Sequence, residues 1–165
     1  MKNKVSAGMI AGCVTFVCAL LGFILYLINI NASGYFQGGS VPQAQLFVIL
    51  SMVTIAIAIC LYFVKVKGIA GKIADIAGDI LSVVSPVLLS ASLMTLVGSR
   101  VEGFAFIYFS NADVLTEVQT PANLSSAHVA IANIVVMAIA IVAGIVWAFL
   151  GKKKNEEISI EIDKA

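Results

Sequence analysis

Charged residues are scarce in this sequence, and their scarcity excludes most classes of soluble protein. Only 12% of the 165 residues are Asp, Glu, Lys or Arg, against roughly 25% in an ordinary soluble domain. Hydrophobic residues make up 61%, and the mean hydropathy is +1.06. A soluble domain of this composition would have too little polar surface to stay dissolved. The net charge is only +1. The chain therefore lacks the strong positive charge that would indicate nucleic acid as a partner.

Catalytic and metal-binding side chains are equally sparse. His128 is the single histidine, and no Ser-His-Asp set, nucleotide-binding loop or HExxH pattern is present. Cys13, Cys18 and Cys60 form no CxxC motif, and we interpret them as small packing residues. No apolar stretch carries a charge near its middle, where ionisable groups mark ion and proton pathways. We therefore expect no enzyme activity, no cofactor and no metal ion.

What the sequence does contain is four apolar stretches, each long enough to cross a bilayer. A spanning helix needs about 20 apolar residues, and residues 5–31, 44–66, 77–99 and 125–150 satisfy that length. They occupy most of the chain, so residues 1–151 are predicted to form one all-α, four-span integral membrane helix bundle. Gly151 and the lysines after it are predicted to end the last helix, leaving residues 152–165 as a charged cytoplasmic tail.

Basic residues predict the orientation of this bundle, because Lys and Arg concentrate on the cytoplasmic side of a membrane. With both termini inside, only Arg100 lies outside, and the other basic residues all lie inside. They are Lys2, Lys4, Lys65, Lys67, Lys72, Lys152, Lys153, Lys154 and Lys164. The sequence therefore predicts a multi-pass protein of the cell membrane, plasma or inner, with both termini cytoplasmic.

Small residues recur at helical spacing on the first and last stretches. Residues three or four positions apart share one helix face, and small ones let a second helix approach closely within a membrane. The predicted packing faces are Gly8, Gly12, Ala19 and Gly22, which Thr15 joins, and Ala140, Gly144 and Ala148. The helix that packs there is either another span of the same chain or a span of a second copy.

The third stretch carries hydroxyl groups and a proline at its middle. Ser82, Ser85, Ser92 and Thr95 fall on one slowly drifting helix face, and Pro86 has no N–H to donate to the carbonyl of Ser82. Two interpretations remain open. The hydroxyls can bond back to the preceding turn while the small side chains pack closely. Alternatively, a kinked helix lines a polar cavity for a small uncharged solute.

The segments between the stretches carry weaker patterns. Residues 104–108 and 114–118 alternate around the turn-forming cluster 110–113, which predicts a small extracytoplasmic β-hairpin between the third and fourth spans. Isoleucines repeat at helical spacing in residues 69–80, which predicts an amphipathic helix at the membrane interface. Asn123 or Ser125 is the predicted N-cap of the last helix.

These patterns favour a small non-catalytic membrane protein that acts through association. It would be a subunit, scaffold or accessory protein of a membrane complex, or a homo-oligomer. The alternative is a small transporter or channel for an uncharged solute, lined by the serines of the third span. The expected partners are the lipid bilayer and either a second copy of the chain or another membrane protein.

Overall fold

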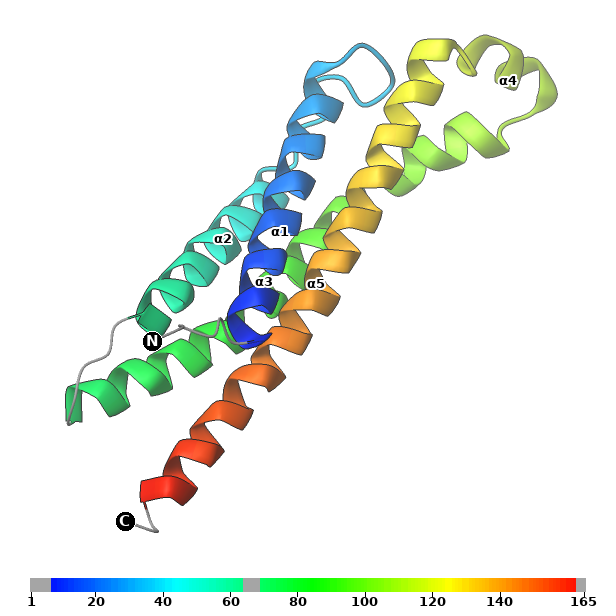
Figure 1. Ribbon diagram of the computed structural model, residues 1–165. Helices are drawn as coiled ribbons and strands as arrows, with labels where there is room; N and C mark the ends of the chain where they lie inside the picture. The colour runs from blue at the N-terminus through cyan, green and yellow to red at the C-terminus, as the bar shows by residue number, and fades with distance from the viewer. Residues whose placement is uncertain (1–6, 64–68, 163–165) are drawn as a thin grey trace.

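The computed structural model describes residues 7–63 and 69–162, with side chains for residues 7–62 and 69–150. The helices are α1 (Ala7–Asn31), α2 (Pro42–Phe63), α3 (Ile69–Phe109), the short α4 (Ala112–Val118) and α5 (Pro121–Ile162) (Figure 1). Four of them contain a segment long and apolar enough to cross a membrane: Ala7–Asn31, Pro42–Tyr62, Ile69–Phe109 and Pro121–Leu150. The prediction of an all-α chain with four such helices is therefore confirmed, and it indicates a membrane protein.

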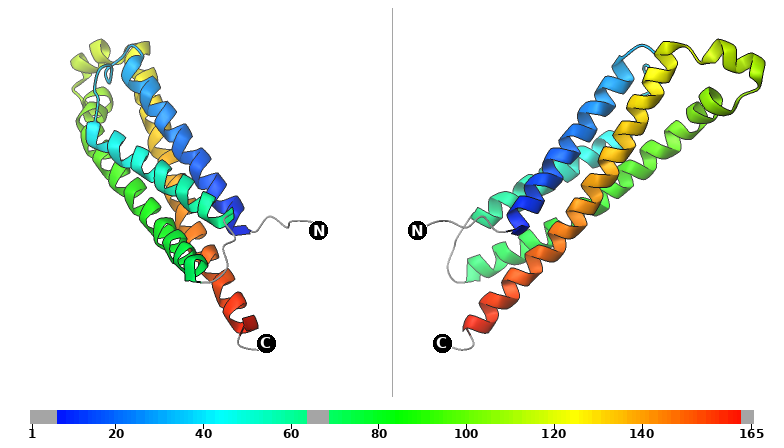
Figure 2. Two further views of the ribbon diagram at one scale, coloured as in Figure 1. Left: turned by 90° about the vertical axis from the view of Figure 1, so that its left-hand side faces the viewer. Right: turned by 45° about the vertical axis from the view of Figure 1, so that its right-hand side comes forward.

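The four long helices run in alternating directions (Figures 1 and 2). α1 begins and α5 ends at one end of the bundle, which we call the terminal end. The loop of residues 32–41 and helix α4 lie at the opposite end, which we call the loop end. α1 contacts α5 and α2, and α3 contacts α2 and α5, so the four helices form a closed ring.

The α1–α5 contact is built from small residues that face large ones. The buried residues of α1 alternate four and three apart: Gly8, Gly12, Thr15, Ala19, Gly22, Tyr26 and Asn29. A Cβ built on Gly12 would lie 2.9 Å from Trp147 Cε2 on α5. One built on Gly22 would lie 2.7 Å from Met137 Sδ. The glycines therefore make room for the two largest side chains that α5 buries here.

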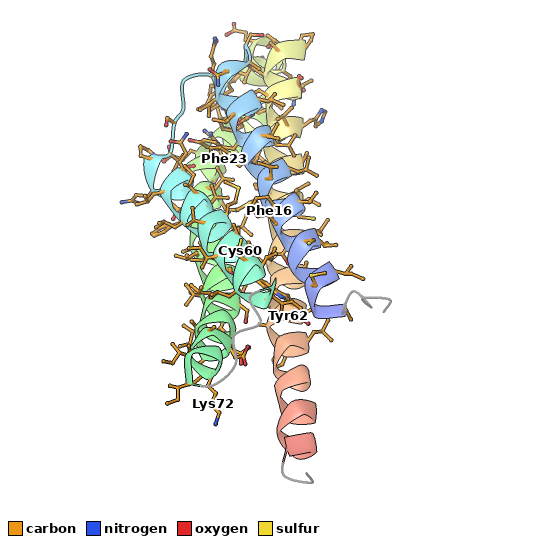
Figure 3. All side chains as sticks on the ribbon, turned by 60° about the vertical axis from the view of Figure 1, so that its left-hand side comes forward. Phe16, Phe23, Cys60, Tyr62 and Lys72 are labelled. Carbon is orange, nitrogen blue, oxygen red and sulfur yellow. The ribbon has the colours of Figure 1, made fainter. Side chains whose placement is uncertain are left out.

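The centre of the core draws on all four long helices. Ala19, Val48, Leu89, Met137 and Ala140 form one buried cluster, with one or two residues from each. Phe16 and Phe23 of α1 lie on the side of α1 that faces α2, at two levels of the bundle (Figure 3). Phe16 packs against the cluster that contains Ile55, and Phe23 packs against the cluster that contains Val48. Aromatic rings thus separate α1 from α2, whereas glycines bring α1 against α5.

The predicted β-hairpin is wrong. Among the described residues there is no strand: α3 continues through Phe109, and residues 112–118 form α4. The alternating aromatic residues coincide with a helical pattern that the prediction overlooked, because Arg100, Gly103 and Ile107 are buried at spacings of three and four. Phe36 from the loop packs beside Gly103 and Ile107, and a lone hairpin is only marginally stable in water.

Both predicted boundaries of the last helix are also wrong. α5 begins at Pro121, and Thr120 is its N-cap, since the Thr120 hydroxyl accepts a hydrogen bond of 3.2 Å from the backbone N–H of Asn123. Proline suits the first helical position because it lacks the N–H that would be unsatisfied there. At the other end α5 continues past Gly151 to Ile162. A single glycine costs about 1 kcal/mol in a helix, which the helix-forming Lys and Glu residues beyond it can offset.

The amphipathic segment predicted at residues 69–80 forms the first turns of α3 and is continuous with the span. Ile69, Ile73, Ile76 and Ile80 are all exposed, and Lys72 points away from the bundle near the start of the helix (Figure 3). The placement of this segment at a membrane interface stays a prediction.

Several residues on which the predicted orientation depends are not placed by the structure. Lys2, Lys4, Lys65, Lys67 and Lys164 lie outside the described residues. The orientation of the termini therefore stays a prediction too.

Glycine substitutions test the α1–α5 contact. Gly12→Ala should lower the free energy of unfolding by about 1–3 kcal/mol, because its new methyl group presses against the rigid Trp147 ring. The matched control is Gly98→Ala, which meets nothing within 4 Å and should raise it by up to about 1 kcal/mol. Unfolding of the purified protein in mild detergent measures both values. An equal response of the two variants would contradict the packing.

Candidate functional site

The residues predicted to line a cavity or kink lie on the inner face of α3. Ser82, Ser85, Pro86 and Ser92 are buried, and Thr95 is half-buried. α3 remains one continuous helix through Pro86. The proline ring packs against α5, where a Cβ built on Gly144 would lie 3.3 Å from Pro86 Cβ.

Most of the hydroxyl groups on α3 donate to carbonyls of their own helix. Ser82 Oγ donates to the carbonyl of Asp79 at 2.7 Å, and Ser85 Oγ donates to that of Leu81 at 2.6 Å. Thr95 Oγ1 donates in the same way at 2.8 Å, to a carbonyl one turn earlier. These bonds satisfy the hydroxyl hydrogens without a ligand, which is the usual behaviour of Ser and Thr within a helix.

Two serines instead connect α3 to α2. Ser92 Oγ donates to the carbonyl of Ala44 at 2.8 Å, and Ser51 Oγ of α2 donates to the carbonyl of Ser85 at 3.0 Å. Sequence reasoning did not single out Ser51. Helical spacing could have identified it, because Ser51 lies three or four positions from Val48 and Ile55. These residues belong to the buried face of α2, with Ala44.

The predicted small-residue faces lie mainly between α1 and α5. Six residues of these faces are buried in the structure: Gly8, Gly12, Ala19, Gly22, Ala140 and Gly144. Ala148 is half-buried and lines a groove of about 320 Å³ on the outside of the bundle, between α3 and α5. Val83, Pro86, Val87 and Ser90 form the α3 side of this groove. The structure thus brings together Pro86 and Ala148, which the sequence analysis assigned to separate features.

Arg100, the basic residue that the sequence analysis places apart from the others, is buried. Its side chain is only 3% exposed, beneath the loop of residues 32–41. Nη2 donates to the carbonyl of Gly39 at 2.9 Å, and the guanidinium carbon lies 4.6 Å from the centre of the Phe36 ring. This distance is within the range of a cation–π interaction. Arg100 therefore fixes the loop to the end of α3.

A second bond holds the same loop, and a buried bond beside it joins α1 to α5. Tyr26 Oη accepts a hydrogen bond of 2.7 Å from the backbone N–H of Val41. Asn29 Nδ2 donates to the carbonyl of Ser126 at 2.7 Å. Gly34 allows the loop to pass close to α5, because its φ is +140° and a Cβ there would lie 2.6 Å from the carbonyl oxygen of Ala122. The loop end of the bundle is thus closed by side chains from α1, α3 and α5.

A small cavity lies inside the bundle toward this end. Its volume for water centres is about 10 Å³. Tyr26 of α1, Gln45 of α2, Ser92 of α3 and Asn133 of α5 contribute polar side chains to its lining, and the remaining lining residues are apolar or glycine. All four long helices therefore meet at this point.

Groups for catalysis or metal binding do not converge anywhere in the part of the chain that the structure describes. Among the side chains of residues 7–62 and 69–150, no three His, Cys, Asp or Glu residues are close enough to hold a metal ion. His128 is exposed near the loop end of α5. Cys13, Cys18 and Cys60 are free thiols on α1 and α2. Comparison of the chain with family models, curated proteins and solved structures gives no match.

Serine substitutions distinguish the two kinds of hydroxyl bond. Ser92→Ala should lower the free energy of unfolding by about 0.5–1.5 kcal/mol, because it removes a bond between two helices. Ser90→Ala is the matched control. Its hydroxyl donates only to the carbonyl of Pro86 in its own helix, so its loss should change stability by less than about 0.5 kcal/mol. Unfolding in detergent provides both values, and a larger effect at Ser90 would contradict this assignment.

Proposed function

We propose that this protein is a non-catalytic multi-pass membrane protein that acts by associating with other membrane-embedded chains. It serves as a subunit, scaffold or accessory protein of a complex, or as a homo-oligomer. One observation carries the proposal: in the described part of the chain, the hydroxyls predicted to line a transport path are already bonded within the protein. The hydroxyls of Ser82, Ser85 and Thr95 bond to backbone carbonyls, and the central cavity has room for about one water. Hydroxyls bonded in this way offer little to a passing solute, which favours a function that uses the outer surface of the bundle.

The outer surface offers a place where another chain can pack. The groove between α3 and α5 has a volume of about 320 Å³ and is lined by apolar residues except for Ser90. Ala148 and Ser90 are small enough to admit the side chains of an approaching helix, and small residues are typical of helix contacts within membranes. At the loop end, Phe109 is 83% exposed beyond the last turn of α3, which adds an aromatic surface where the span meets the headgroups.

We further propose that the protein resides in the cell membrane with both termini in the cytoplasm. The alternating directions of the four long helices support this arrangement, because they place the start of α1 and the end of α5 at the same end (Figure 1). The end of α2 and the start of α3 lie at that end as well. In the sequence, nine of the ten basic residues precede α1, fall within residues 65–72 or follow Leu150, and the tenth is Arg100, near the loop end.

An alanine pair on α5 tests association. Ala148→Leu fills the groove floor between α3 and α5, so it should weaken self-association or partner binding at least about tenfold, which corresponds to about 1.4 kcal/mol. The matched control is Ala132→Leu, at an exposed position of the same helix outside this groove, which should leave association unchanged. Light scattering and mass spectrometry of the protein purified in mild detergent measure assembly. A wild-type protein that is monomeric at all concentrations, with no co-purified protein, would contradict the proposal.

A transport path for a small uncharged solute is the second candidate, and the cavity beside Ser92 favours it because all four long helices reach it. In a variant without the three native cysteines, Ser85→Cys and Ser92→Cys should stay protected from small polar thiol reagents if association is the function. Ser99→Cys, at an exposed position of α3, is the positive control for labelling. Rapid reaction at residues 85 and 92 would support transport instead.

A further inference from the structure

The central cavity contains a hydrogen-bond acceptor that the protein itself leaves unused. Asn133 of α5 is 2% exposed, and its Oδ1 has no hydrogen-bond partner among the described residues. This oxygen lies 3.6 Å from the position that a Cβ on Gly22 would occupy, and both residues line the cavity. Burial of an amide oxygen without a partner costs about 1–3 kcal/mol, so the cavity favours a ligand that can donate to Oδ1.

Tyr26 of α1, one turn after Gly22, also lines this cavity with a polar side chain. The Tyr26 hydroxyl accepts a bond from the backbone N–H of Val41. A phenol is both acceptor and donor, so its own hydrogen remains for a further acceptor. The ligand that suits both groups therefore donates to Asn133 and accepts from Tyr26.

The size of the cavity and its remaining lining select among the ligands that can do both. One water needs roughly 10–15 Å³ of volume for its centre, and the cavity has about 10 Å³. Larger solutes are therefore excluded in this packing. Leu96, Val48 and Met137 supply apolar lining, and no lining residue is charged, so a bare cation would lose its hydration with no negative charge to compensate it.

We propose that this cavity is a binding site for one water molecule, which donates a hydrogen bond to Asn133 Oδ1 and accepts one from the Tyr26 hydroxyl. The water joins α5 to α1 at a level where Gly22 leaves space between them. A Cβ at Gly22 would lie 2.7 Å from Met137 Sδ, so the glycine keeps both the methionine and the water in place. This inference does not depend on the proposed function, because a bound structural water suits an associating protein and a transporter equally.

A structure of the full chain in lipid, at a resolution that shows ordered waters, tests the site directly. We expect one density peak within about 3.2 Å of Asn133 Oδ1, and we expect it to disappear in Asn133→Leu. Well-ordered density for Asn133 with no such peak would overturn the proposal. Elongated density that continues into the bilayer would also overturn it, because that shape indicates a lipid or detergent tail.

Thermal unfolding in detergent gives an independent test through the sign of the change. If water satisfies Oδ1, Asn133→Leu removes a bonded group and lowers the unfolding midpoint. If Oδ1 is unsatisfied, the same substitution removes a buried polar cost and raises the midpoint, which would contradict the proposal. Met137→Leu is the control, because it conserves volume beside the cavity without removing a polar group, and it should leave the density peak in place.

Discussion

Within hydrocarbon, the hydrophobic effect gives a helix no reason to leave lipid for another helix, so this bundle depends on how closely its backbones approach. Gly144 shows the constraint best, because α1 and α3 both reach α5 there. Thr15 Cγ2 and Pro86 Cβ would each lie 3.3 Å from a Cβ at residue 144. A single added methyl group would therefore press on two neighbouring helices. The positions of α1 and α3 around α5 depend on this one small residue.

Polar groups follow from the same constraint, since a buried donor or acceptor in a membrane must find its partner within the protein. Along the middle of α3 the partner is often the preceding turn, as for Ser85 and Leu81. Toward the loop end the partners come from other helices and from the loop, as for Arg100 and Gly39. The polar interactions that join one element to another are thus concentrated toward the loop end.

The number of long helices could be predicted from the sequence, because length and hydropathy alone specify a spanning helix. The region after residue 100 could not, because Phe104 and Phe106 alternate as in a strand while Gly103 and Ile107 are buried as in a helix. Only the packing of Phe36 in three dimensions favours the helical pattern. Asn133 was missed because one amide in an apolar stretch gives no motif. Its importance depends on the cavity beside it, which sequence spacing does not reveal.

Helix α3 has 41 residues without a break, which at 1.5 Å per residue makes it about 60 Å long. The hydrocarbon core is about 30 Å thick, so at the usual tilt of about 20° the helix extends well into water or headgroups. Its midpoint is held at the contact between Pro86 and Gly144. The helix therefore has about twice the length that one crossing requires, so its ends must project from the hydrocarbon or turn along its surface while its middle packs against α5.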